Sequence, residues 1–100
     1  MVIKFLETAQ FELDESVEYY NREIAGLGIK FLEEVLRGID LIANYPEAWP
    51  QISDRTRRCK INRFPFGIIY QNRGDEILIV AIAHFHRKPG YWNERLNQIK

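Results

Sequence analysis

The 100-residue sequence predicts one domain of the α+β class, in which a two-helix hairpin packs on one face of an antiparallel sheet of about four strands. The apolar run at residues 77–83 is too short to cross a membrane, and its β-branched side chains favour a strand covered on both faces. Two stretches with helical periodicity come before it. Shorter strand-like segments and a turn-forming stretch at residues 72–75 complete the pattern.

A short strand at residues 2–6 is followed by the first predicted helix. Thr8 suits the N-cap position of this helix, and acidic residues in its early turns suit the positive end of the helix dipole. Apolar side chains recur at spacings that place them on one face: Ala9, Leu13, Val17, Tyr20 and Ile24. The opposite face carries Glu12, Glu15 and Glu18, which we interpret as a solvated surface.

The second helix is predicted at residues 27–44, after a break that contains two glycines, and it ends before Pro46. Gly38 lies inside its wide apolar stripe. A glycine there costs up to ~1 kcal/mol relative to alanine, so we expect it to permit a close approach to another backbone. The short break between the helices predicts an antiparallel hairpin that covers one side of the sheet.

The second half of the chain supplies most of the predicted sheet. Residues 57–62 alternate in character, and the polar side chains of one face are Arg58, Lys60 and Asn62. This strand, the strand at residues 66–71 and the central strand are expected to form an antiparallel meander. The first strand is expected to pair with the central strand at the sheet edge, and residues 91–99 are expected to form a short closing helix.

The charge distribution is uneven although the formal net charge is +0. Residues 1–50 hold four basic and ten acidic side chains, whereas residues 51–100 hold ten basic and four acidic ones. This asymmetry hints at a polyanion-facing surface in the second half, or at helices and strands that merely solvate their own surfaces. The acidic N-terminal segment is unlike a targeting peptide, and the single cysteine, Cys59, fits a reducing cytoplasm. We interpret Cys59 as a strand residue, with a reactive thiol as the alternative.

Basic and aromatic side chains gather near the predicted end of the central strand. Arg87, Tyr91 and the imidazoles of His84 and His86 follow this strand, and no cluster of cysteines or carboxylates stands beside the two histidines to complete a zinc site. Neither a metal nor a cofactor is therefore expected. Cations and rings on an open sheet face suit a phosphate backbone, or metal-free RNA cleavage. They suit an acidic partner peptide equally well.

Several short motifs resemble those of a known protein family. They are Glu18-Tyr19-Tyr20, Gly28-x-x-Phe31, Trp49-Pro50, Arg57-Arg58, Arg63-Phe64-Pro65-Phe66-x-Ile68-Ile69-Tyr70 and His84-x-x-Arg87-x-Pro89-Gly90-Tyr91-Trp92, with a trailing Arg95. With these motifs the sequence resembles, along nearly its whole length, the RelE/ParE superfamily of toxins from bacterial type II toxin–antitoxin systems, often labelled plasmid stabilisation proteins. The resemblance implies a cytoplasmic, growth-inhibiting toxin and a cognate antitoxin as partner. It is consistent with a homodimer or with a toxin–antitoxin heterotetramer, and with no membrane association.

The resemblance implies two activities. ParE-like members poison DNA gyrase, whereas RelE-like members are mRNA interferases that cleave mRNA on the ribosome. In the nuclease case the catalytic residues would be Arg58, Lys60, Arg87 and Tyr91, with His84 and His86 secondary. Binding of target or nucleic acid would use Arg57, Arg58, Lys60, Arg63 and Arg87.

Two features bear on the choice between the two activities. Gly67 stands where nuclease relatives carry arginine, and the chain is neutral where ribosome-acting relatives are strongly basic. These departures favour the ParE-like interpretation, a toxin that binds a target such as gyrase. The alternatives are the RelE-like nuclease and a non-toxic relative that only binds its antitoxin.

Overall fold

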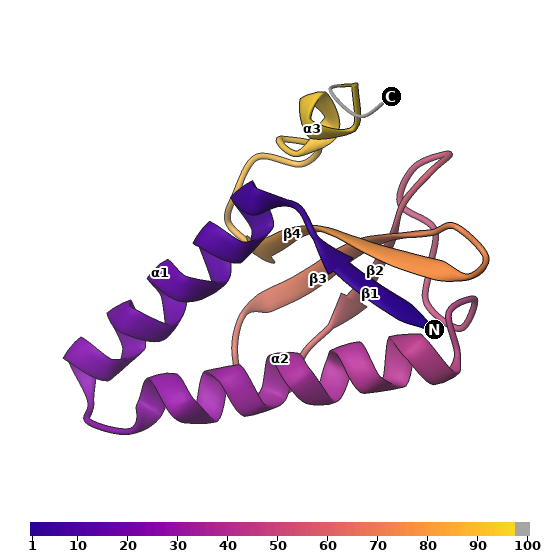
Figure 1. Ribbon diagram of the computed structural model, residues 1–100. Helices are drawn as coiled ribbons and strands as arrows, with labels where there is room; N and C mark the ends of the chain where they lie inside the picture. Colours follow the sequence, from indigo (N-terminus) through magenta and orange to yellow (C-terminus); the bar gives the residue numbers. More distant parts are fainter. Residues whose placement is uncertain (98–100) are drawn as a thin grey trace.

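The computed structural model describes residues 1–97 and confirms the α+β fold. The strands are β1 (Val2–Phe5), β2 (Arg57–Lys60), β3 (Phe66–Asn72) and β4 (Glu76–His84), and they lie in the order β1-β4-β3-β2 (Figure 1). β2, β3 and β4 form the expected antiparallel meander. β1 pairs with β4 at the sheet edge, as expected, but it runs parallel to β4. The sheet is therefore mixed, and the expectation of a wholly antiparallel sheet is wrong for this strand.

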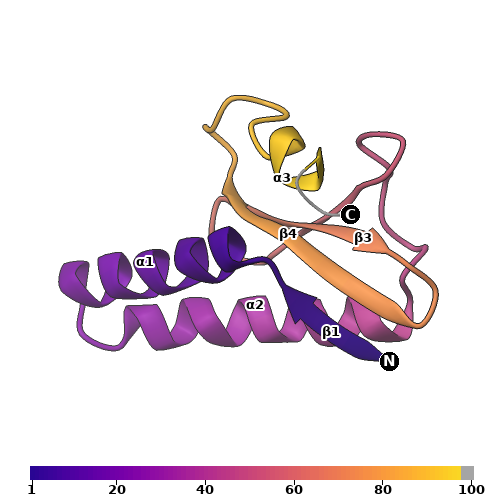
Figure 2. The same cartoon turned by 45° about the horizontal axis from the view of Figure 1, so that its top comes forward.

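Helices α1 (Glu7–Glu23) and α2 (Leu27–Asn44) form the hairpin and cover one face of the sheet (Figure 2). The core between hairpin and sheet contains a cluster of four aromatic rings, in which Tyr20 and Phe31 pack against each other and against Phe64 and Phe66, mostly edge to face. The bounds of α2 agree with the prediction. Gly28, at its start, is buried where α1 and α2 approach each other, and a Cβ at this position would overlap the carbonyl oxygen of Val17.

Three local expectations about the helices are wrong. α1 begins at Glu7 rather than after Thr8, because the Leu6 N–H still donates to the Ile79 carbonyl of β4, at 3.0 Å, and the helix follows the strand at once. Ile24 lies just beyond α1 and is 63% exposed. A Cβ at Gly38 would meet the Ile68 side chain, with 2.7 Å to Cδ1, and not another backbone.

The second face of the sheet is covered by the C-terminal segment and α3 (Asn93–Asn97), which lies across the sheet from α1 and α2 (Figure 2). α3 begins two residues later than the helix expected at residues 91–99, and residues 98 and 99 of that expectation lie outside the described residues. The pairing of β3 with β4 shifts at Ile69 and Tyr70, which leaves Val80 without a paired residue on β3. Val80 and Ala81 consequently both belong to the second core, together with Trp92 and Leu96.

The loop between α2 and β2 is held by two side chains. The Tyr70 hydroxyl donates to the Pro46 carbonyl at 2.6 Å, and Arg57 Nη1 donates to the carbonyls of Glu47 and Trp49. Within residues 1–97, no helix combines the length and the apolar character needed to cross a membrane.

Candidate functional site

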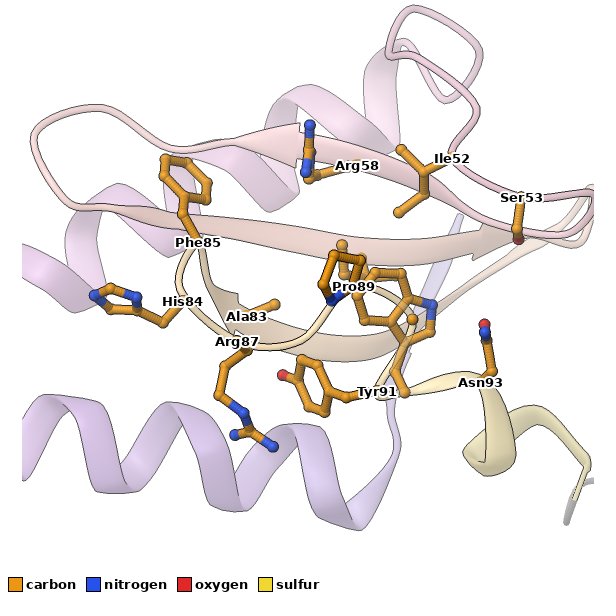
Figure 3. Close-up of a pocket in the computed structure, with 13 residues that line it drawn as sticks. Ile52, Ser53, Arg58, Ala83, His84, Phe85, Arg87, Pro89, Tyr91 and Asn93 are labelled. Carbon is orange, nitrogen blue, oxygen red and sulfur yellow. The ribbon is translucent and has the colours of Figure 1, made fainter.

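A pocket of about 200 Å³ opens at the end of β4, on the face of the sheet that α3 covers (Figure 3). Four of the residues predicted for the site line it: Arg58, His84, Arg87 and Tyr91. Its apolar wall comes from Ile52, Ile69, Ala83, Pro89 and Trp92. The pocket therefore brings residues of β2, β4 and the C-terminal segment to one place, as the alternation in β2 and the position of β4 predicted.

The aliphatic part of the Arg58 side chain, on β2, lies over Gly67 on the neighbouring strand β3. The two residues are neighbours because β2 pairs Lys60 with Gly67 and Arg58 with Ile69. A Cβ at position 67 would lie 2.9 Å from Arg58 Cγ and 3.0 Å from Cδ, so the stem of Arg58 occupies the space that a side chain would need. An arginine at position 67, the pattern of nuclease relatives, is incompatible with this placement of Arg58.

Glu12 fixes the C-terminal segment to the sheet. Its Oε2 accepts hydrogen bonds from the Tyr91 hydroxyl at 2.7 Å and from Arg95 Nη2 at 2.8 Å. Its Oε1 accepts from Arg95 Nη1 at 2.9 Å and from the Ile82 N–H at 3.0 Å. Arg95 Nη1 also donates to the Val80 carbonyl at 2.9 Å. The pairing of β1 with β4 ends at Ile79. Beyond that point the side chains of Glu12 and Arg95 form the hydrogen bonds to the β4 backbone that a longer β1 would have formed.

The interpretation of Glu12 as part of a solvated face is therefore wrong. The side chain is only 13% exposed, because the N-terminal half of α1 runs over the end of β4 and the C-terminal segment closes over it. Sequence periodicity placed Glu12 opposite the apolar residues of α1 and gave no sign of a partner 83 positions away. The quoted motifs contain two members of this network, Tyr91 and Arg95, but they gave no sign that the partner of both lies on the first helix.

Tyr91 is enclosed by the same groups. Burial, and next the hydrogen bond and negative charge of Glu12, raise the pKa of Tyr91, while the positive charges of Arg95 and Arg87 oppose this increase. The Arg87 guanidinium lies 3.9 Å from the centroid of the Tyr91 ring, and the Arg95 guanidinium lies 5.1 Å from it. Tyr91 is thus a neutral hydrogen-bond donor, and its ring forms a cation–π contact with Arg87 at the mouth of the pocket.

The two histidines lie at the other edge of the site. The His84 ring packs edge-on against Phe66, and its Nδ1 accepts a hydrogen bond from the His86 N–H at 3.0 Å. The two imidazole centroids are 4.8 Å apart. Among residues 1–97, no third histidine, cysteine or carboxylate joins them in a group that could hold a metal ion.

Three predicted binding residues lie away from the pocket wall. Lys60 is exposed, with its Nζ 5.6 Å from the centroid of the Phe85 ring. Arg57 is hydrogen-bonded to the loop after α2, and Arg63 is exposed in a left-handed turn with φ 71°. Cys59 points into the hairpin core, and burial raises the pKa of its thiol to about 11, which fits a strand residue and not a reactive thiol.

Comparison with known proteins decides the family. Residues 3–89 match the family model described as the ParE toxin of the type II toxin–antitoxin system parDE. The chain belongs to the ParE toxin family. The resemblance to RelE/ParE toxins is confirmed, and ParE membership makes the chain the toxin component of a type II system, whose partner is an antitoxin. Arg58, His84 and Arg87 lie within the matched residues, whereas Tyr91 and Arg95 follow them.

The ParE fold is also found among solved structures. The chromosomal ParDE TA system from P. aeruginosa matches this chain with a TM-score of 0.71 and 23% sequence identity, over 84% of this chain and 95% of that chain. At this identity the likeness concerns the fold. No curated protein matches the chain.

Proposed function

We propose that this ParE toxin acts in the bacterial cytoplasm by docking the face around Arg58 and Arg87 on a protein target such as DNA gyrase, and that its antitoxin blocks this face. The observation that carries the proposal is that the hydroxyl and the ring of Tyr91 are both already bound to other side chains. Its hydroxyl donates to Glu12 at 2.7 Å and its ring supports Arg87. The residue therefore acts as a scaffold for a binding surface.

Metal-free RNA cleavage makes different demands. A base must remove the 2′-hydroxyl proton, a cation must stabilise the phosphorane, and an acid must protonate the leaving oxygen. A tyrosine whose pKa is raised and whose proton points at a carboxylate is a poor group for either transfer. Lys60 lies beside Phe85 outside the pocket wall, and Gly67 supplies no cation.

A second candidate function, mRNA cleavage on the ribosome, is favoured by one observation. Arg58, His84 and Arg87 line the same pocket, so an RNA segment that crosses it would meet two cations and an imidazole. In this mechanism the arginines would contact successive backbone phosphates and His84 would transfer a proton.

The test compares gyrase supercoiling with mRNA cleavage for the same protein preparation. We expect inhibition of gyrase supercoiling and intact mRNA in a cell-free translation reaction mapped by primer extension. Arg87→Gln should weaken gyrase inhibition at least tenfold, because the variant loses the charge at the mouth of the pocket. Lys88→Gln is the matched control, since Lys88 is the adjacent exposed cation and does not line the pocket.

Each other outcome has a defined meaning. Cleavage at the ribosomal A site that Arg87→Gln abolishes would replace the docking proposal by the nuclease. A protein that inhibits neither gyrase nor translation, yet binds its antitoxin, would be the non-toxic relative. Equal loss of gyrase inhibition in Arg87→Gln and Lys88→Gln would show that general charge, and not the pocket, carries the action.

A further inference from the structure

The pocket has an excess of positive charge that the described chain does not neutralise. Its wall contains Arg58, His84 and Arg87, and no aspartate or glutamate. Within residues 1–97, neither arginine forms an ion pair; the arginines that do are Arg22, Arg37, Arg73 and Arg95. Arg87 also borders a groove that contains Glu12 and Glu15, but Glu12 is bound by Arg95 and Tyr91. The pocket is therefore complementary to an anionic partner.

The two arginines flank an apolar floor. Figure 3 shows Arg58 on one side of the pocket and Arg87 on the other, with their side chains directed away from each other and Pro89 between them. The floor and walls between the two cations include Ile69, Ala83 and Trp92. A single small anion is a poor match for this arrangement, whereas a chain segment that crosses the pocket would reach both cations.

We infer that the pocket receives one apolar side chain of an acidic antitoxin peptide, whose carboxylates on either side pair with Arg58 and Arg87. The inference rests on the proposed function, because it names the contact by which the antitoxin would block the docking face. The volume suits it: the pocket measures about 200 Å³, and an apolar cavity of ~150 Å³ holds benzene. Such a peptide is an acid–apolar–acid segment.

The aromatic rings favour a peptide over RNA. Base stacking needs an open ring face. One face of Tyr91 is covered by Arg87 at 3.9 Å, and Trp92 is only 8% exposed. An aliphatic side chain can instead fill the space between Ile69, Pro89 and Trp92 without stacking.

Trp92 lines the pocket and can therefore report on binding there. The chain contains two tryptophans, and the other one, Trp49, packs against the hairpin core. Replacing Trp49 leaves Trp92 as the spectroscopic probe of the pocket.

The experiment uses the full chain with Trp49→Phe, so that Trp92 alone reports. The probe is a ten-residue acetylated and amidated peptide with a central leucine flanked on both sides by glutamate and aspartate. We expect a saturable change in Trp92 fluorescence with a Kd in the micromolar range. Replacing the leucine by alanine should weaken binding about tenfold or more, as expected from the lost apolar burial.

Charge variants test the flanking contacts. Arg58→Gln and Arg87→Gln should each weaken peptide binding about fivefold, a typical size for a coupling between exposed charges, and Lys88→Gln should leave it unchanged. Circular dichroism of each variant confirms that the fold is retained. A peptide with lysine in place of the acidic residues should not bind.

Two results would overturn the inference. One is the absence of saturable binding of the acidic peptide up to millimolar concentration. The other is tighter binding of a ten-nucleotide single-stranded RNA at the same ionic strength, which would assign the pocket to nucleic acid. The gyrase assay tests the proposed function and not this inference. If the peptide binds but gyrase is not inhibited, the pocket remains the peptide site and gyrase is not the target.

Discussion

The carboxylate of Glu12 joins three parts of the chain that are far apart in sequence. It accepts hydrogen bonds from Ile82 in β4, from Tyr91 after β4 and from Arg95 in α3. Arg95 and Glu12 are 18% and 13% exposed at their side chains, so water screens the pair only partly. The positive charge of Arg95 is in turn favoured by this hydrogen bond, which raises the pKa of the guanidinium.

Removal of this charge should lower stability. Glu12→Gln keeps the shape of the side chain but leaves Arg95 without its counter-charge, and we expect a loss of about 1.5–3 kcal/mol in the free energy of unfolding. Urea unfolding followed by circular dichroism measures it. Glu15→Gln, on the exposed part of the same helix, is the matched control and should change stability by less than about 0.5 kcal/mol. Equal effects of the two substitutions would contradict the role assigned to Glu12.

Tyr70 makes stability depend on pH above neutrality. Burial raises the pKa of Tyr70 to about 12 from its ordinary value of 10.0, and the hydroxyl donates to Pro46. A group whose pKa is raised in the folded state contributes stability that is complete below its unfolded pKa and is lost as pH rises through the folded pKa. Tyr70 should therefore destabilise the fold progressively between about pH 10 and 12.

The substitution Tyr70→Phe isolates this contribution. We expect the variant to be less stable by about 1 kcal/mol at pH 8, because the hydrogen bond to Pro46 is lost. Its stability should then fall less steeply than that of the native chain between about pH 10 and 12, by up to ~1.4 kcal/mol per pH unit. Urea unfolding at a series of pH values measures the slope. Tyr45→Phe, at a 62% exposed tyrosine, should leave the slope unchanged.

Sequence reasoning at the residue scale found the arginines of the pocket and missed Glu12. Arg58 was predictable because alternation in a strand assigns each side chain to a face. Glu12 was not, because a pattern within α1 ranks its residues by polarity and carries no information about β4 or α3. The wrong N-cap at Thr8 has a similar origin, since the start of α1 is set by the pairing of Leu6 with Ile79.

At the scale of elements, the hairpin depends on close contact between α1 and α2. Gly28 donates its N–H to Asn21 Oδ1 at 2.7 Å, and a Cβ there would overlap the backbone of Val17. Gly38 is also crowded, but the atom that it would meet is the end of the Ile68 side chain. Backbone yields less readily than the end of a side chain, so the two glycines differ in how much a methyl group costs.

We expect Gly28→Ala to be more destabilising than Gly38→Ala. The first should cost at least about 2 kcal/mol through the displacement of α1 from α2, within the range for overpacking. The second gains up to ~1 kcal/mol of helix propensity, which offsets part of its packing cost. Thermal unfolding of both variants gives the order directly. If Gly38→Ala had the lower melting temperature, the assigned contact between the helices would be incorrect.

The elements themselves were largely predictable. The bounds of α2 and the meander of β2, β3 and β4 follow from local periodicity and turn residues. The parallel direction of β1 and the register shift at Ile69 and Tyr70 depend on how the hairpin and the second core pack on the sheet. No local pattern specifies such a choice. The closing helix was predicted in the right place, but its start was predicted two residues too early.

At the scale of the whole molecule, the sheet separates two cores, and each core has its own tryptophan. Trp49 packs against the core under the hairpin, whereas Trp92 belongs to the core under α3. The cores share β3 and β4, and Glu12 connects α1 with α3 across the sheet edge. Such coupling favours cooperative unfolding of the domain as one unit.

Single-tryptophan variants test this cooperativity. In Trp49→Phe the fluorescence of Trp92 should report the same urea midpoint as circular dichroism at 222 nm, which follows α1 and α2. Trp92→Phe should show the same agreement for Trp49. If Trp92 fluorescence changed at lower urea than the dichroism, α3 and the second core would unfold as a separate unit.

The pairing of β1 with β4 also has a consequence for synthesis of the toxin. Phe5 lies beside Ile79, so the first strand must wait for a partner roughly 70 residues later in the chain, a delay of about 4–14 s at ~5–20 residues per second. The wall of the pocket is completed later still, by Tyr91 and Trp92. The proposed docking face thus forms only after residues 91 and 92 have been synthesised, so a shorter nascent chain does not yet present it to a target or to the antitoxin.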